Sequence, residues 1–258
     1  SASAIAEVAE NAGQLGIANE HILDFSRTMI DLGEATNMTA DVAATEFARF
    51  ANIVGMSQSD FDKLGSVVVD LGNNLATTEG EIVSMAMRLA GAGKQIGMSE
   101  ADIMALSASL SSVGIEAEMG GSAISKAMIA MQVATSTGFS EVEEMLNFAG
   151  MSLREVEMMA SHSGKAFGEL AEEMGMTKSD LSNLVKAGTD LENFAEISGM
   201  SAEQFKQAFE EDAMGALGSF INGLGSAEEA GESAINMLQE MGITEVRLRD
   251  ALLRAGNA

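Results

Sequence analysis

A seven-residue pattern that ends one helix and begins the next recurs along this chain and constrains its fold more than any other feature. It consists of glycine, methionine, serine or threonine, two free positions, an acidic or amide residue, and an apolar residue. Glycine adopts the left-handed conformation that ends helices, and serine or threonine caps the next helix. The acidic or amide residue completes a capping box, and the two apolar residues suit a hydrophobic staple. The pattern predicts helices joined by short turns.

The complete copies of the pattern number five. They are Gly55-Met56-Ser57 with Asp60-Phe61, Gly97-Met98-Ser99 with Asp102-Ile103, Gly150-Met151-Ser152 with Glu155-Val156, Gly175-Met176-Thr177 with Asp180-Leu181, and Gly199-Met200-Ser201 with Gln204-Phe205. Weaker copies are Asn37-Met38-Thr39, without the acidic residue, and Gly242-Ile243-Thr244, with Arg247 in its place; Thr78 begins a further capping box with Glu81 and Ile82. The chain has no proline, which fits helices that end at glycine.

The spacing of the caps predicts helical hairpins. Ser57, Thr78 and Ser99 are twenty-one residues apart, which fits a helix of about fifteen residues and a short turn. Apolar residues after two of these caps follow one face of a helix: Phe61, Leu64, Val68 and Leu71, and then Ile103, Leu106, Leu110 and Val113. No segment alternates with period two, so we predict no strand. The expected fold is all-α, an irregular array of short antiparallel helices and helical hairpins.

The second half of the chain has a different spacing, which predicts two domains. Its caps at Ser152, Thr177 and Ser201 are separated by 25 and 24 residues. A linker is expected near Thr135–Ser140, where small and polar residues precede Phe139. The predicted domains are residues 1–135, an N-terminal helical core region, and residues 136–258, a C-terminal helical subdomain. Because the chain begins with Ser1 rather than methionine, we expect it to be a fragment of a longer chain.

Composition excludes several classes of function. The net charge is −25, from 39 acidic and 14 basic residues, and such a surface repels nucleic acid, so no direct nucleic-acid binding is expected. Without cysteine, the chain has no disulfide, thiolate zinc site or cysteine nucleophile. The longest uncharged stretch, 213–227, has fifteen residues and is too short to span a bilayer. We expect it to form a buried hairpin or a packed helix.

The side chains that could carry chemistry do not form a recognisable constellation. The two histidines, His21 and His162, are 141 residues apart and lack the spacing of a helical zinc site. Gly91-Ala92-Gly93-Lys94 resembles a phosphate loop only superficially, since Arg88 and Gln95 replace the first glycine and the serine or threonine, so we interpret it as a flexible helix end. We predict no catalytic, cofactor-binding or metal-binding residue, no cofactor and no enzymatic activity.

Two other groups of residues receive structural interpretations. Acidic neighbours occur at Glu143-Glu144, Glu172-Glu173 and Glu210-Glu211-Asp212. Adjacent residues diverge by about 100° around a helix, so these groups are interpreted as solvated faces. The 20 methionines could form an adaptable binding surface, but several lie in the staple positions, and core packing is the favoured interpretation.

Two segments of the chain carry helix-ending motifs in a set order. The first contains Gly97-Met98-Ser99, Val113-Gly114-Ile115-Glu116-Ala117 and Gly120-Gly121-Ser122-Ala123-Ile124. The second runs from Gly199 to Phe205, through Ala213-Met214-Gly215-Ala216-Leu217 and Phe220-Ile221-Asn222-Gly223-Leu224, to Gly242-Ile243-Thr244. Both segments resemble the core region of siphophage-type tail tape measure proteins, and the N-terminal residues 6–50 are also similar to that family. The family commonly has Ala-Gly-Thr where this chain has Gly120-Gly121-Ser122.

The resemblance implies a structural role in a virion. Tape measure proteins lie in the lumen of the phage tail, are assembled there in the host cytoplasm, set the length of the tail tube and leave ahead of the DNA during infection. The implied partners are tail tube and tail-tip proteins, tail assembly chaperones and other copies of the chain. Contact with the host membrane is a further possibility for the full-length protein.

Two alternative functions remain open from the residues alone. One is a non-catalytic acidic helical adaptor that binds partner helices through methionine-rich grooves. The other is a helical enzyme domain such as a cell-wall hydrolase, which the missing catalytic residues and the scarcity of aromatic residues, 4% of the chain, disfavour.

Overall fold

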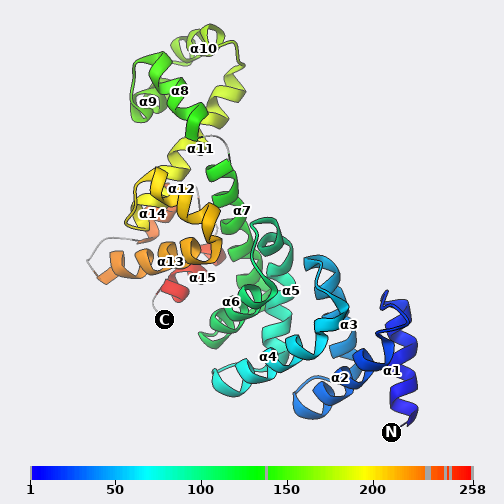
Figure 1. The fold of residues 1–258 in the computed structure, drawn as a ribbon. Helices are drawn as coiled ribbons and strands as arrows, with labels where there is room; N and C mark the ends of the chain where they lie inside the picture. The colour runs from blue at the N-terminus through cyan, green and yellow to red at the C-terminus, as the bar shows by residue number, and fades with distance from the viewer. Residues whose placement is uncertain (1, 137–138, 230–233, 241–242, 244–245, 257–258) are drawn as a thin grey trace. The chain divides into compact units, whose positions relative to one another are not determined.

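The chain is all-α, as the capping pattern predicts. The computed structural model describes residues 2–136, 139–229, 234–240, 243 and 246–256, and within these ranges it contains fifteen α-helices, one 3₁₀ turn, one π-helical turn and no strand (Figure 1). The lengths of the helices after Thr78 and Ser99, 17 and 13 residues, agree with the predicted hairpins. The prediction of an all-α array of short helices is therefore confirmed.

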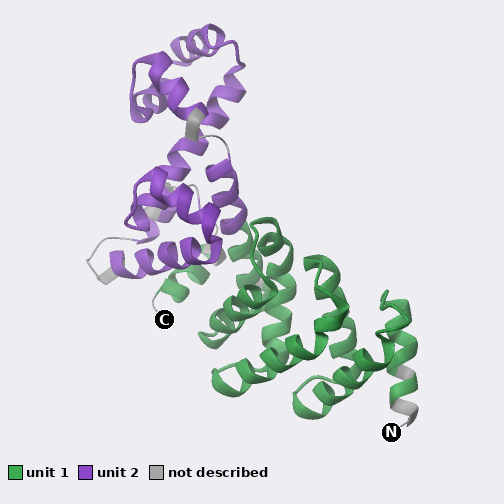
Figure 2. Cartoon of the chain, viewed as in Figure 1, with its two compact units in different colours: residues 1–126, 245–256, 258 green, residues 127–244, 257 purple. Residues whose placement is uncertain are grey.

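The chain forms two compact units (Figure 2). Unit 1 comprises residues 1–126, 245–256 and 258, and unit 2 comprises residues 127–244 and 257. Unit 1 contains α1 (Ala2–Gln14), α2 (Ile22–Ala35), α3 (Ala40–Val54), η1 (Gln58–Asp60), α4 (Phe61–Asn74), α5 (Glu79–Gln95), α6 (Glu100–Ser112), η2 (Ala117–Gly121) and α15 (Val246–Gly256). Helix α7 (Ser122–Ser136) begins in unit 1 and continues in unit 2.

Unit 2 also contains α8 (Phe139–Ala149), α9 (Leu153–His162), α10 (Gly164–Glu173), α11 (Lys178–Ile197), α12 (Ala202–Glu211), α13 (Ala213–Glu229) and α14 (Ala234–Glu240). The predicted linker overlaps the C-terminal end of α7, and Thr137 and Gly138 lie outside the described residues. The domain division at residues 135/136 stays a prediction.

Unit 1 is a two-layer stack of helices. In one layer α1 packs against α3, α3 against α5, and α5 against η2; in the other layer α2 packs against α4, and α4 against α6. Consecutive helices such as α2 and α3 or α5 and α6 pack across the layers. The buried core lies between the layers, where the rings of Phe25 and Phe61 meet edge to face at 4.7 Å. Each pair of helices thus buries its apolar faces against the next pair.

The turns between helices follow the predicted chemistry. All five pattern glycines, and also Gly16 and Gly114, have φ between +62° and +86°. After each of the seven, the backbone N–H of the next residue donates to the carbonyl five residues earlier, as from Met98 N to Gly93 O at 2.9 Å. This bond is the hallmark of the Schellman motif. Capping boxes are complete at Thr78, Ser99, Ser152, Thr177 and Ser201.

One predicted capping box is wrong. Ser57 begins the 3₁₀ turn η1 instead, and its Oγ accepts from Ser59 N at 3.4 Å. Helix α4 starts only after Asp60, whose carboxylate pairs with Lys63 at 2.7 Å rather than with the Ser57 backbone. The intervening Gln58 bonds the turn between α1 and α2, so a contact distant in sequence accompanies the altered geometry. Thr39 caps α3 without a box, as expected, and Thr244 lies outside the described residues.

Unit 2 has two groups of buried side chains. The first joins α8, α9, α10 and α11 around Met145, Val156, Phe167 and Leu181. The second joins α11, α12 and α13, where the Phe194 ring stacks on Phe205 at 5.9 Å and meets Phe220 edge to face at 5.2 Å. The uncharged stretch 213–227 belongs to the single packed helix α13, one of the two predicted forms. Within the described residues, no helix combines the length and apolar character needed to cross a membrane.

Candidate functional site

The stacked turns of unit 1 are tied together by side-chain hydrogen bonds. At one edge of the stack, Gln58 accepts from Ala18 N at 2.8 Å and donates to Gly16 O at 3.1 Å. At the other edge, Asn37 Oδ1 accepts from Gly80 N at 3.0 Å, and the hydroxyls of Thr77 and Ser111 lie 2.6 Å apart. Each bond joins one turn to the corresponding turn of the next helix pair. The two edges are therefore held in register by polar side chains rather than by apolar packing alone.

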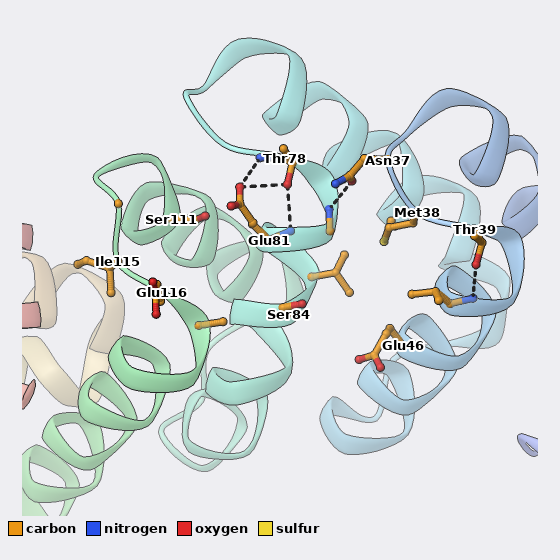
Figure 3. A pocket seen from close by; sticks show the side chains of 15 residues that line it. Asn37, Met38, Thr39, Glu46, Thr78, Glu81, Ser84, Ser111, Ile115 and Glu116 are labelled. Carbon is orange, nitrogen blue, oxygen red and sulfur yellow. Dashed lines mark hydrogen bonds between the residues drawn. The ribbon is translucent and has the colours of Figure 1, made fainter.

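The second of these edges contains a groove of about 640 Å³. It is lined by Asn37, Met38, Thr39, Val42, Glu46, Thr78, Gly80, Glu81, Val83, Ser84, Ser111, Gly114, Ile115, Glu116 and Ala117. Figure 3 shows these residues on three neighbouring elements: α3, α5 and the segment that leads from α6 into η2. We call this hollow the α3–α5–η2 groove.

The spacing of these elements explains why they line one groove. Thr39 directly precedes α3, Thr78 directly precedes α5, and Ala117 begins η2. These three positions are separated by 39 residues each time. A two-helix repeat of this length returns the chain to the same edge once per repeat. The sequence pattern indicated the capped turns but missed the groove. The groove could have been predicted from the 39-residue interval alone. The interval separates the cap at Thr39, the capping box at Thr78 and the π-helical turn at Ala117, which have no sequence motif in common.

The groove combines an apolar lining with acidic charge. Val83, Met38 and Ile115 are buried beneath it, and Val42 remains 49% exposed. Its charged lining side chains, Glu46 and Glu81 and Glu116, are all carboxylates. No lysine, arginine or histidine is among the lining residues. The groove is therefore a partly apolar surface of negative charge.

The positive ends of two helices meet this groove but are already occupied. Thr39 Oγ1 accepts from Val42 N at 3.3 Å at the start of α3. At the start of α5, Glu81 accepts from Thr78 N and from Thr78 Oγ1, both at 3.0 Å (Figure 3). These bonds hold the pKa of Glu81 below its ordinary value, because they stabilise the carboxylate. The carboxylates of Glu46, Glu81 and Glu116 would therefore repel an anionic ligand and attract a cationic one.

None of the candidate residues for chemistry lines this groove. His21 precedes α2, with Nε2 3.7 Å from Glu20, and His162 is exposed at the end of α9, with Nδ1 3.1 Å from Met158 O. Gly91–Lys94 is not a loop: it is the last turn of α5, where the absence of a side chain on Gly93 lets Ile103 approach.

The acidic neighbours and the methionines have the environments expected of them. Glu143, Glu144, Glu172 and Glu173 are exposed, and so are Glu210, Glu211 and Asp212. In the part of the chain that the structure describes, no three potential ligands from histidine, cysteine, aspartate and glutamate are grouped to hold a metal ion. Among the side chains that the structure describes, eight methionines are buried, including Met29, Met85 and Met145, in agreement with core packing.

The family model described as phage-related minor tail protein matches residues 1–188, a range that includes the whole groove. None of the curated proteins compared with the chain matches it.

Proposed function

Because this chain belongs to the family of phage-related minor tail proteins, we propose that it is the folded core region of a tail tape measure protein. The observation that carries the proposal is the family match over residues 1–188. The order of the helix-ending motifs, which resembles that of tape measure proteins, supports the more specific role. In this role the full-length chain sets the length of the tail tube during assembly and leaves ahead of the DNA on infection.

The proposed role is structural and not enzymatic. It places the chain in the lumen of the tail, in contact with tail tube and tail-tip proteins, and brings it into contact with tail assembly chaperones and other copies of itself during assembly in the host cytoplasm. The repeated helix pairs of unit 1 suit this role, because a stack whose members contact only their neighbours can change length without losing its core.

The test changes the length of the chain by one repeat. Deletion of residues 40–78 from the full-length gene removes α3, η1 and α4 and joins Thr39 to Glu79, so that Thr39 can cap α5 in place of Thr78. Electron microscopy should show tails shorter by about 60 Å, if the removed residues are helical in the tube at about 1.5 Å each. Duplication of residues 40–78 should lengthen tails by a similar amount.

The control for this test alters the fold without altering the length. The substitution Gly97→Ala strains one turn and should leave the length of assembled tails unchanged. Tails of normal length in both the deletion and the duplication would contradict the tape measure role, although the chain would remain a member of the minor tail family.

A further inference from the structure

The strongest unassigned surface of the described structure is the α3–α5–η2 groove. Its lining side chains supply both an exposed apolar residue, Val42, and carboxylates from three successive repeats. The negative charge is only weakly compensated, since Arg49 approaches Glu46 at 3.9 Å and its side chain is 60% exposed. A ligand that matches the groove must therefore be apolar on one side and positively charged on the other.

A basic amphipathic helix of the same chain packs behind one wall of this groove. Three of the 14 basic residues, Arg247, Arg249 and Arg254, fall within the eleven residues of α15, together with a single acid, Asp250. Helix α15 buries Ala251 and Leu252 and packs against η2. The guanidinium of Arg254 donates to Gly114 O at 3.4 Å. A helix that is basic and partly apolar, the kind of ligand that matches the groove, thus already packs beside it.

The turn at residues 114–116 lies between the α3–α5–η2 groove and helix α15. Gly114, Ile115 and Glu116 line a cavity of about 140 Å³ against α15, and the same three residues line the α3–α5–η2 groove. This turn therefore presents one side to a basic helix of the same chain and another side to the open groove. The carbonyl oxygen of Gly114 and the carboxylate of Glu116 are acceptors suited to lysine or arginine.

We propose that the α3–α5–η2 groove is a docking surface for a basic amphipathic helix of a partner protein. The apolar side of the helix packs over the exposed Val42, and its cations face Glu46 and Glu116. Glu81 contributes negative charge while it remains bound to Thr78. Charge complementarity identifies the partner, because an acidic helix or a nucleic acid would meet carboxylates on all three lining elements. The proposal goes beyond the tape measure role and does not depend on it.

The first experiment measures binding of a defined probe. The probe is a fluorescent helical peptide of lysine and leucine with the leucines on one face, and its affinity for the whole chain is measured by anisotropy at about 150 mM salt. The double variant Glu46→Gln with Glu116→Gln should weaken binding about tenfold. Ser84→Trp, which places an indole in the groove at an exposed position, should also weaken binding by obstructing the apolar surface.

The matched control lies in the same unit and carries the same loss of charge. Asp31 and Asp70 line a second acidic hollow between α2 and α4, and both are exposed. The double variant Asp31→Asn with Asp70→Asn should bind the peptide as the unmodified chain does. Equal weakening in both double variants would show attraction to the net charge of −25 and would overturn the proposal. Unchanged binding in the groove variants would overturn it as well.

A second experiment locates the peptide. Since the chain has no cysteine, Ser84→Cys and Ser182→Cys each provide one attachment point for a nitroxide label. Ser182 is exposed on α11 in unit 2. The label at Ser84 should broaden the NMR signals of the bound peptide more strongly than the label at Ser182. The reverse pattern would overturn the proposal.

Self-association is measured separately by sedimentation. The partner-helix proposal expects no groove-dependent dimer of the chain alone. A dimer abolished by Glu46→Gln with Glu116→Gln would assign the groove to a second copy and would overturn the proposal.

Discussion

At the scale of single residues, glycine has two distinct roles in this chain. Gly97 has a φ of +84° and ends α5, while Gly91 lies within the same helix with open space around its missing Cβ. Only the first position needs glycine for its backbone conformation. The sequence distinguishes them because Gly97 is followed by the methionine and the capping serine, and Gly91 is not.

We predict opposite effects for alanine at these two positions. Gly97→Ala should lower the free energy of unfolding by about 1–2 kcal/mol, because a left-handed residue with a Cβ is strained. Gly91→Ala should raise it by about 0.5–1 kcal/mol, because alanine restricts the unfolded chain and favours the helix. Urea unfolding followed by circular dichroism measures both values. Equal effects at the two positions would contradict the assignment of Gly97 as a strained position.

The ends and starts of many helices are therefore predictable from the sequence. Every glycine of the five complete patterns is left-handed, and five of the six predicted boxes form, including the one at Thr78. Gly16 lies outside the pattern because Ile17 follows it and no serine or threonine comes next. The box at Ser57 fails where Gln58 makes contacts some forty residues away, at Gly16 and Ala18. A local pattern contains no information about such a contact.

At the scale of helices, the capping boxes should make stability depend on pH. Bonds from the Ser152 backbone and hydroxyl to Glu155 hold the pKa of this carboxyl below its ordinary value. The hydroxyl and backbone of Thr177 act in the same way on Asp180. A lowered pKa in the folded state stabilises the fold above the unfolded value of about 4, and this contribution disappears as pH falls through the folded pKa.

The substitution Glu155→Gln tests this dependence. Glutamine keeps the geometry of the box, as Gln204 does at the start of α12, but it cannot be protonated in this range. The melting temperature of the variant should therefore fall less between pH 7 and pH 3 than that of the unmodified chain. Thermal melts at both pH values give the comparison. Parallel losses in the two proteins would show that the box at Ser152 makes no titratable contribution.

Helix packing supplies a third prediction, in α13. A Cβ added to Gly223 would lie 1.8 Å from Ile197 O, a backbone atom at the end of α11, whereas a Cβ on Gly218 would meet nothing within 4 Å. Gly223→Ala should therefore destabilise unit 2 by more than about 2 kcal/mol, because one of the two backbones must move. Gly218→Ala should be neutral or stabilising. Both variants replace glycine by alanine within α13, and only the one at residue 223 brings a Cβ against a backbone atom. Denaturant unfolding of the two variants therefore separates helix propensity from close packing.

At the scale of the whole molecule, the excess of acidic residues leaves some carboxylates in places that disfavour their charge. Glu192 on α11 is one: partial burial is the main cause of its raised pKa, and the charges of Glu157 and Glu196 raise the pKa further. A raised pKa means that the folded chain binds the proton more tightly than the unfolded chain. Stability then falls as pH rises above the unfolded value of about 4, and this loss is complete above the folded pKa.

Removal of this charge should stabilise the molecule at neutral pH. Glu192→Gln should raise the melting temperature at pH 7, and the gain should shrink towards pH 4 and at high salt. Glu203→Gln, on the exposed side of α12, should have a smaller effect. Scanning calorimetry at pH 4 and pH 7 tests the difference. A gain that persists unchanged at pH 4 would exclude electrostatic repulsion as its cause.

The arrangement of unit 1 was less predictable than its elements. The caps predict where the helices start, but the two layers depend on contacts between helices that are distant in sequence, such as α1 with α3 and α2 with α4. The groove depends on the same long-range order, since its three walls share a 39-residue interval and no motif. The capping motif recurs once per helix, whereas the segments that line the groove recur once per two helices. The motif therefore could not reveal the groove.

The bonds that Asn37 and Gln58 make across neighbouring turns have a consequence for inheritance. Because the helix pairs of unit 1 make their main contacts with the pairs beside them, a recombination that duplicates or removes a whole pair preserves the packing of the remaining pairs. A change of a few residues instead shifts every following turn out of alignment. Such a gene can gain or lose length readily only in whole repeats, so descendants of this chain should differ in size by discrete steps.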